Sequence, residues 1–582
     1  MPSGQFAFVL HSHLPYVISH GKWPHGTDWL NEAAAETYLP ILGTLRELID
    51  EGYHPRLTVG LSPVLCEQLA DESFKREFEE YCAQKIDAAE QDKEEFRRHG
   101  RAQMLSVAES WIEFYSQTID HFRRISRDIL GQFRSLQDNG YLEIITCGAT
   151  HGYLPLLARD ESVQCQIKLA IANYRRHFGQ SPRGIWLPEC AYRPRYAWSR
   201  PVGQAGSAVM RKGVDEFLSE NGLDFFIVDS VLLKGGKSTG VYIERFEALK
   251  LLWHQFESQY SQRTEEPDKS PREVYLVASS PEGKKPTAIF ARDPQTGILV
   301  WSGEHGYPGD GNYLDFHKKH FPGGHRYWAV TSSKADLADK VEYNPKNASG
   351  RISENAAHFV SRVEEILDES TVSHAGPSIL VAPYDAELFG HWWFEGPRFL
   401  KEVLKGVEKS DSVELAFLGE HYDQARPSQV VSIPEGSWGQ GNHHYIWLNE
   451  QTEWTWKHIY ESEDTMCALA RFWVDNPDRQ DAELTAVLKQ LARELLLMSA
   501  SDWQFLISTF AARDYAELRL SEHYEDFTRL AKMARAYIDG EQISSSDRQF
   551  LRDCQDRDNL FEEIDLNWLA SVEYPAEPAN AT

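Results

Sequence analysis

The 582-residue chain has little positive charge and no long hydrophobic run, and each shortage excludes a class of protein. Lys and Arg number 60 against 88 Asp and Glu, which gives a formal net charge of −28. A chain this acidic is poorly suited to holding the phosphates of nucleic acids or anionic lipids. No apolar run reaches membrane-spanning length, and the N-terminus lacks the basic and apolar regions of a signal peptide. We therefore expect a cytoplasmic protein with no nucleic-acid or membrane partner.

Cysteine is also scarce, and its placement argues against disulfides and structural zinc. The seven cysteines are odd in number, and no two of them form a CxxC pair. This usage predicts reduced thiols, as is typical of intracellular proteins. The chain also lacks an HExxH motif. These absences predict no zinc knuckle and weigh against a catalytic zinc site.

Aromatic residues, in contrast, are plentiful, with 17 Trp, 25 Tyr and 28 Phe. Most of them are expected to fill hydrophobic cores, but Trp and Tyr also offer the flat apolar faces on which sugars stack. The chain length predicts two or three domains. Alternating strand and helix patterns predict an α/β domain over residues 1–410, interrupted by a helical insertion at 63–136. Residues 411–582 are predicted to form a C-terminal helical domain.

Several short apolar runs end at a polar side chain. Residues 185–187 are too few for a helix, and a proline separates them from Glu189. The strand-like runs 5–10, 141–146, 225–228 and 378–382 lead to polar residues in the same way. In an α/β barrel, the C-terminal ends of the strands face one active-site mouth. The polar residues predicted to meet there are His11, His13, His151, Glu189, Asp229 and Asp385.

This set of residues leaves several interpretations open. Two carboxylates among aromatic side chains suit cleavage of a glycosidic bond, in which one attacks the anomeric carbon and the other protonates the leaving oxygen. The three histidines with Asp229 could instead bind zinc in a deacetylase or a metal-dependent glycosidase. A non-catalytic glucan-binding protein would explain the tryptophans but not the carboxylates. Glu189 could also simply pair with Arg193 or Arg195.

Five motifs in order carry a resemblance to a known family. They are HSHLPY (11–16), ITCGATHGYLP (145–155), WLPECAY (186–192), APYDAELFGHWWFEGP (382–397) and GSWGQGNHHYIWLNE (436–450). This order resembles glycoside hydrolase family 57, and the longer forms most resemble its 1,4-α-glucan branching members. The resemblance implies a distorted (β/α)7 barrel, in which the 1–410 domain is catalytic and the C-terminal helical domain contributes to the cleft.

The resemblance also implies a retaining double displacement on an α-1,4-glucan such as amylose or glycogen, with transfer to a 6-hydroxyl and no cofactor. Glu189 would be the nucleophile and Asp385 the general acid/base, with their carboxyls about 5–6 Å apart. The implied substrate-binding residues are His11, His13, Trp29, His151, Tyr242, Arg292, Trp301, Gly309, Trp438, Trp447 and Asp502.

The region 233–286 departs from the family pattern. Tyr242 resembles a tyrosine on a mobile loop that excludes water in the branching members. Because water exclusion separates transfer from hydrolysis, an amylase-type hydrolase or a 4-α-glucanotransferase on the same barrel remains the alternative.

Overall fold

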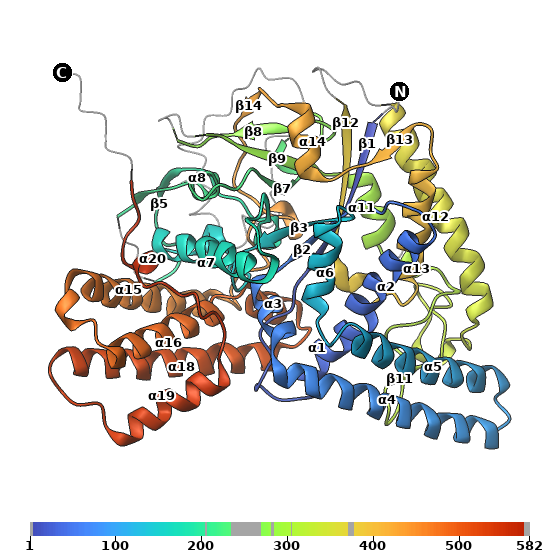
Figure 1. Cartoon of the computed structure of the whole chain (residues 1–582), viewed down its shortest axis with the longest axis horizontal. Coiled ribbons are helices and arrows are strands. Elements are labelled where there is room, and N and C mark those ends of the chain that lie inside the picture. The colour runs from blue at the N-terminus through green and yellow to red at the C-terminus, as the bar shows by residue number, and fades with distance from the viewer. Residues whose placement is uncertain are drawn as a thin grey trace.

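In the computed structural model, seven parallel strands close into a barrel. Helices lie around these strands (Figure 1). The structure describes residues 4–203, 207–233, 269–280, 285–303, 305–369 and 377–574. The barrel order is β12-β1-β2-β3-β4-β7-β9, and β9 pairs with β12 to complete the circle. The strands are β1 (Gly4–Ser12), β2 (Leu57–Leu61), β3 (Leu142–Cys147), β4 (Gly184–Trp186), β7 (Phe225–Asp229), β9 (Thr287–Arg292) and β12 (Ser378–Asp385). The predicted (β/α)7 barrel is therefore confirmed.

Both faces of these strands are buried, and alternate side chains serve different cores. In β1, Phe6 and Phe8 pack with the surrounding helices, whereas Ala7 and Val9 belong to a second cluster inside the barrel. The same two-residue period continues to His11, which therefore lies on the interior side at the end of the strand. In register, His11 stands opposite Asp385 of β12.

Helices surround the barrel and bury one apolar face each. They include α2 (Leu39–Asp50), α7 (Asp160–Phe178), α12 (Pro345–Asp368) and α13 (Gly396–Glu408). In α13, Phe399, Leu400, Val403, Leu404 and Val407 are all buried. Their spacing of three or four residues places them on one face of the helix, which packs against its neighbours.

The helices predicted within residues 63–136 are present. They are α3 (Pro63–Ala70), α4 (Glu72–Arg98), α5 (Ala102–Arg124) and α6 (Ile129–Asp138). The two long helices α4 and α5 form a pair at one edge of the molecule (Figure 1, blue). Phe78 of α4 packs against Phe122 of α5 with ring centroids 4.6 Å apart. Asp71 accepts a hydrogen bond from the Ser73 N–H and so caps the first turn of α4.

The C-terminal part of the chain forms a helical layer beside the barrel (Figure 1, orange to red). Its helices are α15 (Glu453–Asp475), α16 (Ala482–Met498), α17 (Ser501–Thr509), α18 (Arg513–Ile538), α19 (Ser545–Arg557) and α20 (Asn567–Ala570). Before them, β13 (Val413–Leu415) pairs with β1, and β14 (Val430–Val431) pairs with β8 (Tyr275–Val277). The division of the chain into folding units at residues 410 and 411 stays a prediction. None of the described helices is both long and apolar enough to cross a membrane.

Candidate active site

A large cavity of about 1870 Å³ lies at the C-terminal ends of the barrel strands. Most of the predicted site residues line it, together with Asp229. They are His11, His13, Trp29, His151, Glu189, Asp229, Arg292, Trp301, Asp385, Trp438, Trp447 and Asp502. The structure therefore brings together side chains that lie as far apart as residues 11 and 502.

Two of the predicted substrate-binding residues are not placed in this cavity. Gly309 ends the short turn η5 (Tyr307–Gly309), where a side chain would collide with the backbone of Gly303, and it is not among the cavity-lining residues. Its glycine is explained by this close approach within the loop. Tyr242 lies outside the described residues, as does most of the altered region 233–286.

Glu189 is positioned by its own backbone conformation and by hydrogen bonds from Trp438 and from Ser501, the first residue of α17. It sits in the turn η3 (Pro188–Cys190) with φ 61° and ψ 24°, a left-handed conformation that costs a non-glycine residue energy and is often kept at functional sites. The indole N–H of Trp438 donates to Glu189 Oε2 at 2.8 Å, and the Ser501 hydroxyl donates to Oε1 at 2.9 Å. The Trp438 backbone N–H also donates to the Glu189 carbonyl.

Burial raises the pKa of Glu189 to about 7, and the carboxylate of Asp502 adds to this effect. The hydrogen bonds from Trp438 and Ser501 act in the opposite direction, because they favour the charged form. Glu189 is therefore a carboxylate that accepts two hydrogen bonds and ionises near neutral pH. This is the environment expected for a nucleophile.

Asp385 has a different environment. Burial raises its pKa well above the ordinary value, and the negative charges of Glu387 and Glu189 raise it further, while Arg292 lowers it. Within the described part of the chain, no hydrogen bond reaches the Asp385 carboxyl. The protonated form is therefore favoured, as a general acid requires.

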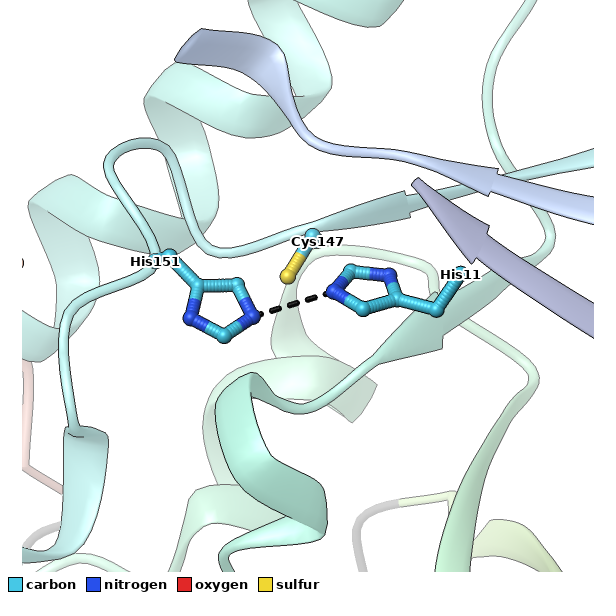
Figure 2. A group of neighbouring side chains, drawn as sticks. All are labelled: His11, Cys147 and His151. Carbon is cyan, nitrogen blue, oxygen red and sulfur yellow. Dashed lines mark hydrogen bonds between the residues drawn. The ribbon is translucent and has the colours of Figure 1, made fainter. Parts of the chain in front are cut away.

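His11 and His151 form a chain of hydrogen bonds that leads to Glu189. His11 Nε2 and His151 Nε2 lie 3.0 Å apart (dashed line in Figure 2). His151 Nδ1 lies 2.8 Å from Ser501 Oγ. Because Ser501 donates its only proton to Glu189, it must accept from His151 Nδ1–H. His151 Nε2 is then the acceptor for His11 Nε2–H. Burial lowers the pKa of both histidines well below the usual value, which agrees with two neutral rings.

His13 connects the barrel to the C-terminal helices. Its Nε2 lies 3.1 and 3.0 Å from the two carboxylate oxygens of Asp502, and its Nδ1 lies 2.9 Å from Ser62 Oγ. The polar residues at the start of α17 are thus explained, because Ser501 and Asp502 bond to Glu189 and His13 of the barrel. The ring of His13 also stacks on His151 at 3.9 Å between centroids.

The aromatic part of the cavity surrounds Glu189. Trp438 packs edge-on against Trp301 at 5.8 Å between centroids, and the Arg292 guanidinium lies 5.7 Å from the Trp438 ring. Asp229 forms an ion pair with Arg292 at 2.9 Å. Trp447 is almost fully buried and stacks on Tyr153, so only part of its surface faces the cavity.

Two groups of side chains here could hold a metal ion by geometry. They are His11 with Cys147 and His151 (Figure 2), and His13 with His151 and Asp502, each with ligand atoms within 4.8 Å of one another. Burial raises the pKa of the Cys147 thiol, which favours the proton over a metal ion. The Nε2 atoms of His11 and His151 are already engaged with each other, and Asp229, the fourth member of the zinc hypothesis, pairs with Arg292. These contacts favour a role for the histidines in hydrogen bonding over a role as metal ligands.

Sequence reasoning missed two residues next to the catalytic carboxyls, Ser501 and Glu387. Ser501 belongs to a short polar run, Ser499 to Asp502, within an otherwise helical pattern, and this run is the signal that points to it. Glu387 lies two residues after Asp385, is buried, and accepts hydrogen bonds from the Tyr38 hydroxyl at 2.5 Å and the His13 N–H at 3.1 Å. Its position inside the fourth motif was the only hint.

Ser501→Ala tests the hydrogen-bond chain. Removing the donor to Oε1 leaves the Glu189 carboxylate with less stabilisation, so its pKa rises and the acidic limb of kcat/KM moves to higher pH. We expect activity at pH 6 to fall about tenfold while activity at pH 9 changes little. Ser499→Ala is the matched control, because its hydroxyl bonds the Leu495 carbonyl in the same stretch. An equal loss at both pH values would contradict this role.

Comparison with known proteins identifies the family of this chain independently of the site geometry. The profile of glycosyl hydrolase family 57 matches residues 7–434, and that of the 1,4-alpha-glucan branching enzyme C-terminal domain matches residues 458–568. A 1,4-alpha-glucan branching enzyme of Thermococcus kodakarensis is 42% identical over 568 residues, which is 96% of this chain and 78% of that protein.

Solved structures agree with these matches. The GH57-type branching enzyme of Pyrococcus horikoshii has a TM-score of 0.86 at 39% identity, covering 99% of this chain and 98% of that chain. The alpha-amylase AmyC of Thermotoga maritima has a TM-score of 0.78 at 28% identity, covering 99% and 100%.

Proposed function

The chain belongs to glycosyl hydrolase family 57, and from this membership we propose that its cavity cleaves an α-1,4-glucosidic bond and transfers the glucan to a 6-hydroxyl. The protein is thus a 1,4-α-glucan branching enzyme that forms α-1,6 branches. The observation that carries the proposal is a pair of largely buried carboxyls in the cavity with different surroundings. Glu189 accepts hydrogen bonds from Trp438 and Ser501, whereas Asp385 receives none from the described residues.

The reaction follows from these two environments. Glu189 attacks the anomeric carbon and forms a covalent glucosyl ester while Asp385 gives its proton to the departing 4-oxygen. Asp385, now ionised, takes the proton of an incoming 6-hydroxyl, whose oxygen attacks the same carbon and releases Glu189. A retaining reaction needs the carboxyls about 5–6 Å apart. Both carboxyls line the same cavity, and their separation stays a prediction.

The remaining residues bind and orient the sugar. His11, His13 and His151 line the cavity with Glu189, and their nitrogens bond to one another, to Ser62, to Ser501 and to Asp502, so a sugar hydroxyl would share or replace one of these bonds. Bonds to sugar hydroxyls that tighten in the transition state would lower the barrier. Trp29, Trp301 and Trp438 supply apolar surfaces for the flanking glucose units.

The alternatives are less well supported. A hydrolase of the amylase type shares the barrel, but the branching-enzyme C-terminal profile and the higher identity to a branching enzyme favour transfer. The zinc hypothesis is less well supported because Asp229, one of its four ligands, forms an ion pair with Arg292. We also propose amylose and glycogen as the substrates. We propose the cytoplasm as the location, because all seven cysteines are unpaired and buried, as is typical of reduced thiols.

The test is proton NMR of amylose after incubation with the enzyme, scored together with a reducing-end assay. We expect new α-1,6 signals with few new reducing ends. Reducing ends without α-1,6 signals would instead identify a hydrolase. In parallel, exhaustive chelation should leave the activity unchanged, and a loss restored by zinc would revive the metal hypothesis.

A further inference from the structure

The active-site cavity extends well beyond the catalytic residues, toward the long helix α4. On that side it is lined by Gln84, Asp87 and Gln91 of α4, by Phe321, and by Trp392. We call this part of the cavity the arm groove. Phe321 lies in the turn between β10 (Lys319–His320) and β11 (His325–Arg326). None of these five residues has a part in the chemistry described above.

The arm groove is a built surface, because the β10–β11 hairpin is fixed to α4 by specific contacts. Lys85 Nζ donates to the Gly323 carbonyl at 3.1 Å, and His325 Nε2 lies 2.8 Å from the Lys85 carbonyl. His320 Nδ1 lies 3.0 Å from Asp92. Gly323 approaches Ala88 so closely that an added Cβ would lie 2.5 Å from the alanine Cβ. The turn that carries Phe321 is therefore held at a set distance from α4.

The side chains that line the arm groove are of the types that bind sugars. Phe321 is 71% exposed and Trp392 is 39% exposed, so the fold leaves two large aromatic faces in water. Gln84, Asp87 and Gln91 are also exposed, and their spacing of three and four residues places them on one face of α4. Flat apolar surfaces beside amide and carboxylate groups are what the faces and hydroxyls of glucose require.

The position of the groove distinguishes between the two glucan chains that a transferase must bind. Trp392 follows Asp385 on the same loop, after the turn η7 (Ala386–Leu388). The leaving oxygen and the incoming 6-hydroxyl both meet the acid/base, so the chain that brings this hydroxyl lies on the Asp385 side. Trp438 and Ser501 instead contact the nucleophile.

We propose that the arm groove binds the acceptor glucan and presents its 6-hydroxyl to Asp385. This inference rests on the proposed branching function and adds a second chain to the same cavity. The occupant follows from the continuity of the groove with the catalytic cavity and from its pairing of exposed aromatic faces with polar groups. Binding of the acceptor there competes with water for the glucosyl-enzyme.

Phe321→Ala and Trp392→Ala test the proposal, with amylose as substrate and with α-1,6 signals and reducing ends measured together. Loss of one stacking surface should raise the ratio of hydrolysis to branching about tenfold. Added short maltooligosaccharide acceptor should restore part of the branching, because the defect lies in acceptor binding. Leu337→Ala is the matched control, since Leu337 is 52% exposed but does not line the cavity.

Two outcomes would overturn the proposal. If branching and hydrolysis fall in the same proportion, the groove serves the donor chain. If both aromatic variants behave like Leu337→Ala, the groove binds neither chain. Failure of the branching function itself is distinguishable, because then the wild-type enzyme also forms no α-1,6 links.

Discussion

Glu189→Gln should abolish both branching and hydrolysis, by about 10⁴-fold or more, and should also stabilise the folded protein above neutral pH. The loss of activity follows because no covalent ester can form on an amide. Transfer and hydrolysis share this first step, so they must fall together. Trp438 and Ser501 keep their positions, because the amide oxygen can still accept one of their hydrogen bonds.

The gain in stability follows from the pKa of Glu189. Burial raises that pKa from 4.5 to about 7, so the folded carboxyl keeps its proton at a pH where the unfolded chain has released it. The free energy of unfolding therefore decreases as pH rises between these values, by about 3 kcal/mol for this group. Glutamine carries no charge, so the variant should be more stable than the wild type at pH 8 and nearly equal at pH 4.

Thermal unfolding at the two pH values, combined with the activity assay, measures both effects. Glu463→Gln is the matched control, because Glu463 is also buried with a pKa raised to about 7 but accepts from the backbone N–H groups of Ala158 and Arg159 outside the cavity. It should retain turnover. Wild-type activity in Glu189→Gln would remove Glu189 from the mechanism, and an unchanged Tm difference between the two pH values would contradict the pKa argument.

The barrel and much of its mouth could be predicted from sequence because they depend on local patterns. Short apolar runs that stop at His11, Glu189 or Asp385 identify buried parallel strands whose ends share one face. The five motifs then assigned roles to these side chains by resemblance. The assignments of nucleophile and acid remain predictions, which the hydrogen bonds at Glu189 and the burial of Asp385 support.

Contacts made by docking of distant segments could not be predicted. Nothing in the local pattern relates Ser501 to Glu189, or His13 to Asp502, since these pairs meet only when the C-terminal helices pack on the barrel. The arm groove likewise needs the β10–β11 hairpin to rest on α4, some 240 residues away in the chain, as the Lys85 contacts show. For Gly309 the structure shows a close approach to the Gly303 backbone within the loop, and the substrate contact implied by the resemblance stays a prediction.

Asp385→Asn should lower branching of amylose by about 10²–10⁴-fold while sparing the first step on an activated donor. A natural glucan leaves as an alkoxide unless Asp385 protonates it. An aryl maltooligosaccharide with an acidic phenol needs no such proton, so Glu189 can still attack it. The second step then stalls, because no base deprotonates the incoming hydroxyl, and the glucosyl ester on Glu189 accumulates.

Rapid mixing with the aryl donor should therefore give a burst of phenol close to one equivalent per enzyme, and intact-protein mass spectrometry should detect the ester. Azide, which needs no base, should restore turnover as a glycosyl azide. The pH profile offers an independent readout: wild-type activity declines as pH rises through the elevated pKa of Asp385, and the variant loses this alkaline limb. Equal losses on both donors, with no burst, would show that Asp385 does not act as the acid, because only the poorer leaving group depends on its proton.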